Sequence, residues 1–409
     1  MASTSSSSSS PSAMEIDSDT ALDLVKKGAF LLLLDVPQFT LLGIDTQVFS
    51  VGPKFKGIKM IPPGCHFLYY SSSNKEGNEF SPIVGFFLTL HPSQVVVRRW
   101  HQQDERLIKL SEDEEFRYSE AVKRLEFDSQ LGPYQLDRYT EWQQLSNFLS
   151  QDIIERLEPI GGEITIMQEA ELIENKGPQT EMEKRLMDQL KGAKCASIEV
   201  SKGRESKGCY YTKIPHFVRN QHVPGDELTA LNLDKTKLLE TILNRDFGGK
   251  EDLLLGELQF SFIAFMMGQS LEAFYQWKSI ISLLLSCTEA PLHTRTHLFL
   301  KFVKVLYYQI KHGFQKNRNQ NNGGGIGNSL FLDEGWFSKD IFLYRLCKDF
   351  FPVVLEAQAV DGDLLLWTRK LKKLLETSLG WDFDNNSLMA EEDDEFAPVV
   401  VPLEETNFG

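Results

Sequence analysis

The chain has 409 residues, of which 42% are hydrophobic and 25% are charged, and its formal net charge at pH 7 is −15. This length exceeds what one hydrophobic core usually organises, so we expect two or three domains. No run approaches the roughly 18 uncharged apolar residues that a membrane span needs, which argues against a membrane-spanning segment.

The first 20 residues form a serine-rich leader. It begins MASTSSSSSSP, carries no Lys or Arg before Lys26, and contains Glu15, Asp17 and Asp19. Transit peptides are rich in Arg and poor in acidic residues, so this composition argues against one. We predict a disordered leader over residues 1–20.

Residues 21–167 are predicted to form a β-rich domain. Between Ala29 and about Leu110, short runs rich in Val, Ile, Phe and Tyr are separated by Gly, Pro, Asn and Ser. This pattern is typical of strands joined by turns. The spacing predicts a sheet or small sandwich of about six to eight mostly antiparallel strands.

Two helices are expected after these strands. Ser111 and Glu114 have the S-x-x-E spacing of a capping box, which predicts a helix that begins at Ser111. Apolar residues recur at helical spacing from about Asp137 to Leu157, and Pro159 follows. We therefore predict one helix over 137–157, and we expect the two helices to cover one face of the sheet.

Residues 168–214 are predicted to form a flexible linker. They combine short polar stretches with Gly177-Pro178 and one short helix near Glu181–Leu190. Six basic residues lie between Lys191 and Lys213, with two acidic residues among them. Such a dilute run fits a solvated linker better than nuclear targeting or RNA contact.

Residues 215–385 are predicted to form an all-helical domain, a stacked array or bundle, which makes the chain an α+β protein of two domains. Residues 315–327, QKNRNQNNGGGIG, are a low-complexity insert between helices. The clearest helical segments are Thr236–Leu243, Leu253–Met267, Leu271–Leu285, Thr294–Ile310, Lys339–Phe350 and Asp363–Leu379.

The last residues, 386–409, form an acidic tail. After Lys373 the chain has ten acidic residues and no basic one, so residues 1–373 hold 48 acids against 43 bases, a net charge of −5. This balance argues against a direct nucleic-acid site, since such sites neutralise phosphates with Lys and Arg. Within the tail, Val399, Val400 and Val401 lie between two prolines. A β-prone segment of this kind can add to the sheet edge of another protein, although residues alone favour a solvated tail without a partner.

The Cys and His residues do not predict a metal site. The five cysteines are widely spread without a CxxC pair, which indicates reduced thiols and neither a zinc site nor a disulfide framework. His293 and His297 stand four residues apart, but no Glu follows His293 as in HExxH and no third ligand is evident.

The residues that could suggest catalysis do not combine into a site. Asp45-Thr46 lacks the Gly of the aspartic-protease DTG motif, and the adjacent Cys65 and His66 should point to opposite faces of a strand. Asp361-Gly362-Asp363 is interpreted as a turn followed by a helix N-cap. We therefore predict a chain that is not an enzyme and has no catalytic, cofactor-binding, metal or small-molecule site.

Four blocks of sequence resemble the Aar-two family of cistron-splicing factors, which act in assembly of the U-five snRNP. They are Leu31–Ser73, which includes IKMIPPGCHFLYYSSS, and the stretches 131–165, 255–290 and 333–352. The resemblance implies an N-terminal sheet domain and a C-terminal helical domain similar to VHS solenoids. The leader, the linker and the insert are where the chain looks least like this family.

The resemblance also implies a function in the nucleus and cytoplasm. Family members bind the large core protein of the U-five particle, the Prp-eight protein, at its RNase-H-like and Jab/MPN domains. They hold an immature particle until a helicase replaces them, and their C-terminal tail bridges two partner domains. This favours a binding role for Val399–Val401, and Ser197, Ser201 and Ser206 in the linker are available for phosphorylation.

Two alternatives remain open from the residues. Helical arrays also occur in vesicle-trafficking adaptors, and a fold does not fix a function. The second alternative is a hydrolase whose catalytic acids, such as Asp35 and Asp45, are dispersed along the sequence. The N-terminal IKMIPPG segment is a feature that a trafficking adaptor has no reason to carry.

Overall fold

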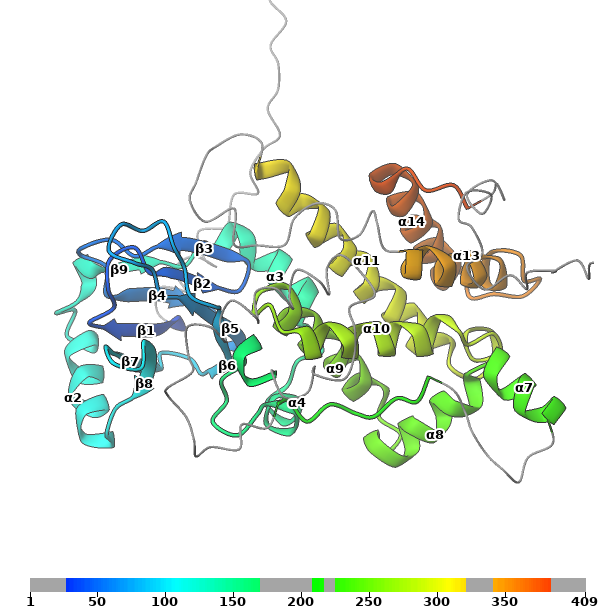
Figure 1. Cartoon of the computed structure of the whole chain (residues 1–409), viewed down its shortest axis with the longest axis horizontal. Coiled ribbons are helices and arrows are strands. Elements are labelled where there is room, and N and C mark those ends of the chain that lie inside the picture. The colour runs from blue at the N-terminus through cyan, green and yellow to red at the C-terminus, as the bar shows by residue number, and fades with distance from the viewer. Residues whose placement is uncertain (1–26, 170–207, 217–224, 321–340, 384–409) are drawn as a thin grey trace, which may run out of the picture.

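The computed structural model describes residues 27–169, 208–216, 225–320 and 341–383. The predicted leader, most of the predicted linker, the second half of the insert and the acidic tail lie outside these residues. A strand-rich N-terminal part packs beside a helical C-terminal part, which confirms the predicted α+β architecture (Figure 1). Among the described helices, none combines the length and the apolar character that crossing a bilayer requires.

The N-terminal part contains two sheets. The first has the order β8-β7-β1-β4-β9 and the second the order β3-β2-β5-β6. Five of the seven pairings between these strands are antiparallel, and β1–β7 and β4–β9 are the parallel ones. The strands are β1 Ala29–Leu34, β2 Leu41–Ile44, β3 Gln47–Ser50, β4 Gly57–Ile61, β5 Gly64–Ser71, β6 Val84–Leu90, β7 Val95–His101, β8 Arg106–Lys109 and β9 Leu131–Pro133.

The alternation along β1 shows how the layers are arranged. Leu31 and Leu33 are buried in the core between the two sheets, whereas Leu32 and Leu34 point to the opposite face. There they pack with Val122 of helix α2, Glu112–Lys123. Helix α2 therefore covers the outer face of the first sheet, as the period of two residues along a strand allows.

The two predicted helices do not cover the same face. The second one is also not a single helix: it comprises a 3-10 turn Leu136–Arg138, helix α3 Tyr139–Ser146 and helix α4 Gln151–Leu157. Trp142 of α3 packs with Phe67 and Phe87 of the second sheet. The break between α3 and α4 involves a long-range contact, because Gln259 of the helical part accepts the backbone N–H of Phe148 there.

The capping box at the start of α2 forms only in part. The Ser111 hydroxyl donates a hydrogen bond to Glu114 Oε2 at 3.1 Å and accepts none from a backbone N–H. The Glu114 carboxylate also accepts from the backbone N–H of Ser111, and these bonds hold the pKa of Glu114 below its ordinary value. The helix starts where it was predicted, at the residue after Ser111.

The helical part is built around α9. Every residue of α9 from Leu254 to Met266 is buried, and α9 contacts α3, α4, α8, α10 and α11. A helix that is buried on all sides is expected at the centre of a domain. The helices are α7 Gly225–Leu233, α8 Thr236–Phe247, α9 Glu251–Met266, α10 Leu271–Leu285, α11 Thr296–Gln320, α13 Ile341–Leu355 and α14 Gly362–Leu379.

Most predicted helices of this part are found with shifts of a few residues. Helix α10 has the predicted bounds, because Ser270 caps it and its hydroxyl accepts a hydrogen bond from the N–H of Ala273. At the turn predicted for Asp361-Gly362-Asp363, the N-cap of α14 is Asp361, whose side chain accepts from the N–H groups of Asp363 and Leu364. Helix α11 is longer than predicted and takes up the first residues of the low-complexity insert, to Gln320.

Candidate interaction surface

The two parts of the chain share one hydrophobic core. The ring of Phe87 on β6 stacks on that of Phe260 on α9, with 4.5 Å between ring centroids. Nearby, α9 approaches the α3–α4 connection so closely that a Cβ at Gly256 would lie 2.7 Å from the carbonyl oxygen of Phe148. Only glycine fits there without displacement, so the sheet part and the helical part form one packed unit.

Gln259 of α9 holds the break between α3 and α4. Its side-chain oxygen accepts the backbone N–H of Phe148 at 2.7 Å, and its Nε2 donates to Asn147 Oδ1 at 2.7 Å. The side chain is fully buried. A buried N–H that leaves a helix needs an acceptor, and here the acceptor comes from the other part of the chain.

An ion pair joins α3 to α11 at the edge of the same contact. His312 Nδ1 lies 2.5 Å from Glu141 Oε1. Burial alone would raise the pKa of the Glu141 carboxyl, but the hydrogen bond and the charge of His312 outweigh it and lower that pKa. The ionised carboxylate is therefore the stable form of Glu141 against α11.

A short extended segment, residues 208–216, is also attached to α9 and α10. Glu257 is completely buried, and its carboxylate accepts the backbone N–H of Thr212 at 2.7 Å and the Thr212 hydroxyl at 2.8 Å. Gln276 Nε2 donates to the carbonyl of Thr212 at 2.9 Å. Burial raises the pKa of Glu257 despite these bonds. Residues 208–214, which the sequence places in the linker, thus pack against the helical part.

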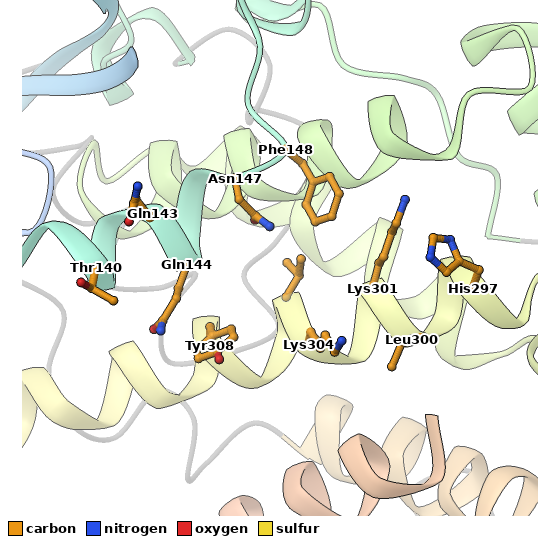
Figure 2. Close-up of a pocket in the computed structure, with 11 residues that line it drawn as sticks. Thr140, Gln143, Gln144, Asn147, Phe148, His297, Leu300, Lys301, Lys304 and Tyr308 are labelled. Carbon is orange, nitrogen blue, oxygen red and sulfur yellow. The ribbon is translucent and has the colours of Figure 1, made fainter. Parts of the chain in front are cut away.

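A groove of about 440 Å³ lies between α3 and α11 (Figure 2). One wall is polar, and its side chains come from α3 and the residues just after it. The other wall comes from α11, where His297, Lys301 and Lys304 follow one helix face at steps of four and three residues. The complete lining is Thr140, Gln143, Gln144, Asn147, Phe148, His297, Leu300, Lys301, Lys304, Val305 and Tyr308.

The groove combines three kinds of group that suit a peptide ligand. Side-chain amides such as Gln143 and Gln144 each offer donors and an acceptor to a peptide main chain. Phe148, Leu300 and Tyr308 add apolar surface, and the two lysines add positive charge. Pockets with an apolar lining and a few polar groups are the usual places for ligands.

The buried Asp45–His66 pair does not make a catalytic site. His66 Nδ1 lies 2.7 Å from Asp45 Oδ2, and His66 Nε2 lies 2.6 Å from the carbonyl oxygen of Pro62. Both neighbours are acceptors, so both ring nitrogens donate and neither is available as a base. Burial alone would lower the pKa of His66, but Asp45 and the Pro62 carbonyl outweigh it and raise that pKa.

The neighbouring cysteine faces the other way, as the sequence predicts. Cys65 Sγ lies 3.9 Å from Thr89 Oγ1 and 3.7 Å from the carbonyl oxygen of Leu149. Asp45 is in the β2–β3 turn with a φ of 55°, and Tyr134 donates a 2.6 Å hydrogen bond to its carboxylate. This buried network ties the turn to the end of the first sheet.

His293 and His297 do not lie on one helix. His293 is in a π-helical turn, Ala290–Thr294, and His297 is in the first turn of α11. No cluster of three or more potential metal ligands occurs among the described residues. The other predicted sites lie outside them, namely Val399, Val400 and Val401 in the tail and Ser197, Ser201 and Ser206 in the linker.

Both parts of the chain match models of one family. Residues 27–159 match the AAR2 N-terminal domain and residues 211–384 match the AAR2 C-terminal repeat region. The chain belongs to the AAR2 family. The groove walls therefore come from both AAR2 domains, with α3 in the first and α11 in the second.

Two of three relatives are similar to the chain over nearly their whole length, and the third over about three quarters of it. The Homo sapiens "Protein AAR2 homolog" is 32% identical over 403 residues, covering 96% of this chain and 98% of the relative. The Caenorhabditis elegans "Protein AAR2 homolog" is 31% identical, covering 88% and 96%. The Saccharomyces cerevisiae "A1 cistron-splicing factor AAR2" is 24% identical, covering 66% and 73%. None of these three names states an enzymatic activity.

The sequence prediction missed the groove. Thr140, Gln143, Gln144 and Asn147 do repeat on one face of α3, at steps of three, one and three residues. A polar stripe of this kind is equally typical of a helix face in water, so it carried no signal. The sequence likewise predicted the α11 wall only as a helix that contains lysines, and nothing in that pattern indicated a groove.

Proposed function

We propose that this chain is a splicing factor that acts by binding another protein during assembly of the U-five particle. The observation that carries the proposal is membership of a family whose yeast member is named a cistron-splicing factor. The partner in this proposal is the large core protein of the particle, the Prp-eight protein, at its RNase-H-like and Jab/MPN domains. The chain occupies the immature particle and a helicase later replaces it.

The architecture supports a binding role. The shared core makes the two AAR2 domains one unit, so surfaces on both keep a fixed relation to each other. Such a unit presents a partner with a preformed surface and loses little conformational entropy on binding. The proposal includes no catalytic step, since His66 and Asp45 satisfy one another in the interior.

The tail and the linker have separate parts in the proposal. Val399–Val401 adds a strand to a sheet edge of the partner, where main-chain hydrogen bonds supply affinity. Phosphorylation of Ser197, Ser201 or Ser206 adds negative charge to the linker and regulates release of the partner. In this proposal the chain acts in the nucleus and the cytoplasm.

Affinity purification of the tagged full chain at low salt tests this function. We expect recovery of the large core protein without the helicase of mature particles. Recovery of mature particles alone, or of no splicing protein, contradicts the proposal. The matched control is the same purification at high salt, which separates specific binding from adventitious charge contacts with the acidic tail.

A further inference from the structure

The groove between α3 and α11 continues into a basic patch on α14. The ammonium of Lys304 lies 5.3 Å from the ring centroid of Trp367, and that of Lys370 lies 4.3 Å from the same ring. The Trp367 ring also contacts Tyr308, which lines the groove, at 5.9 Å between centroids. Two cations on one indole thus extend the positive wall of the groove from α11 to α14.

Most carboxylates beside this surface already have partners. Asp252 pairs with Lys301 at 2.6 Å, and Glu141 pairs with His312. Within the described ranges, Lys304 and Lys370 form no ion pair with any carboxylate. In a chain with a net charge of −15, this patch is a local positive surface with unmatched charge.

The rest of the surface selects for an extended ligand with apolar side chains. The amide of Gln144 faces the groove from α3, opposite Tyr308 on α11 (Figure 2). Leu366, next to Trp367, is a large apolar side chain that remains 48% exposed. An occupant should therefore carry several carboxylates, some apolar residues and an open main chain.

The chain contains a segment with this chemistry. Residues 384–409 hold eight acidic residues and no basic one, together with Phe396, Val399–Val401 and Leu403. They follow α14 directly, and α14 packs on α11, with Tyr307 and Trp367 at 5.5 Å (Figure 1). Twenty-six residues can span up to about 85 Å, against about 40 Å for the whole of α11.

We propose that residues 384–409 dock on the groove of their own chain, with their carboxylates at Lys304 and Lys370 and their apolar residues against Phe148, Tyr308 and Leu366. A segment tethered this close has an effective concentration of about 1 mM, so docking with an intrinsic Kd of about 0.1 mM fills most of the site. The docked tail is withheld from other sheet edges until a partner competes for it. That consequence rests on the proposed function, whereas the docking itself does not.

Carbodiimide cross-linking of the full chain tests the docking without any partner. Because no Lys or Arg follows Lys373, trypsin leaves residues 374–409 as one peptide whose cross-links are easy to assign. We expect this peptide to be joined mainly to Lys304 and Lys370, roughly tenfold above the exposed Lys54 and Lys237, and the preference to vanish in 1 M NaCl. Cross-links spread evenly over exposed lysines overturn the proposal.

Two variants and one mixing experiment sharpen the test. T140E/Q143E should weaken the preference, because it adds negative charge to the α3 wall of the groove and keeps both reactive lysines, whereas the matched control Q102E/Q103E, with the same charge change in an exposed turn, should keep it. The fivefold tail variant E391Q/E392Q/D393N/D394N/E395Q should abolish it, and it leaves the groove unaltered if T140E/Q143E fails to fold. When unlabelled and ¹⁵N-labelled chains are mixed, docking within one chain gives only unmixed peptide pairs. Mixed pairs would show binding to a second copy and overturn the proposal.

Discussion

The side chain of Gln259 accepts the backbone N–H of Phe148 at 2.7 Å, so a residue of one AAR2 domain determines where a helix of the other domain ends. The same side chain donates to Asn147. These two bonds link helix α9 to the connection that leads from α3 to α4, next to the groove.

Gln259→Leu should destabilise the protein by about 1–3 kcal/mol, because the buried N–H of Phe148 loses its acceptor while side-chain volume is retained. Urea unfolding followed by circular dichroism measures the loss. Gln103→Leu, in an exposed turn, is the control and should change the free energy of unfolding by less than about 0.5 kcal/mol. Equal stability of the two variants would show that the bond does not hold the helix break.

Gly256→Ala should cost about 1–3 kcal/mol through overpacking. The new methyl group would lie 2.7 Å from the Phe148 carbonyl oxygen and 3.1 Å from Ile153 Cγ1, so α9 and α4 must move apart. Gly52→Ala is the matched control, since a Cβ there meets nothing within 4 Å. Thermal unfolding of both variants checks the prediction. It fails if the Gly256 variant has the same midpoint temperature as the wild type.

Stability should fall as the pH rises through neutrality because of Glu169. Its carboxylate accepts the N–H groups of Leu271 and Glu272 at the start of α10, yet burial raises its pKa to about 7. A raised pKa means that the folded protein binds more protons than the unfolded one between about pH 4.5 and 7. This contribution to stability is complete below pH 4.5 and is lost as the pH rises through 7.

Glu169→Gln isolates that contribution, since it removes the titrating group and keeps an oxygen acceptor. Between pH 5.5 and 8.5, the free energy of unfolding of the wild type should fall by about 2 kcal/mol more than that of the variant. Urea titrations at the two pH values give both slopes. Parallel slopes would mean that Glu169 titrates normally in the folded protein.

Deleting residues 389–409 should weaken binding to the isolated partner domains by about 2–4 kcal/mol, because an added strand contributes several main-chain hydrogen bonds. Isothermal titration calorimetry gives the affinities. Deletion of residues 1–20 serves as the control and should leave them unchanged. If the tail deletion also leaves affinity unchanged, Val399–Val401 is not a partner-binding strand.

Local signals were sufficient for much of the fold. The helical segment Leu271–Leu285 was predicted with the bounds that α10 has, and the turn predicted at Asp361-Gly362-Asp363 precedes α14. Alternation of apolar runs and turn-forming residues predicted about six to eight strands between Ala29 and about Leu110, and eight are found there. Adjacent residues on a strand point to opposite faces, which is why the separation of Cys65 from His66 was predicted correctly.

What the sequence determined by itself was most of the elements, their order and the family, because caps, periodicity and sequence blocks are properties of neighbouring residues. Tertiary structure alone decided the split between α3 and α4, the Asp45–His66 pair and the groove. Each depends on a contact between separate segments: Gln259 with Phe148, Asp45 with His66, and α3 with α11. Hydrogen-bond acceptors and cavity walls that come from another element leave no periodic trace in the residues that use them.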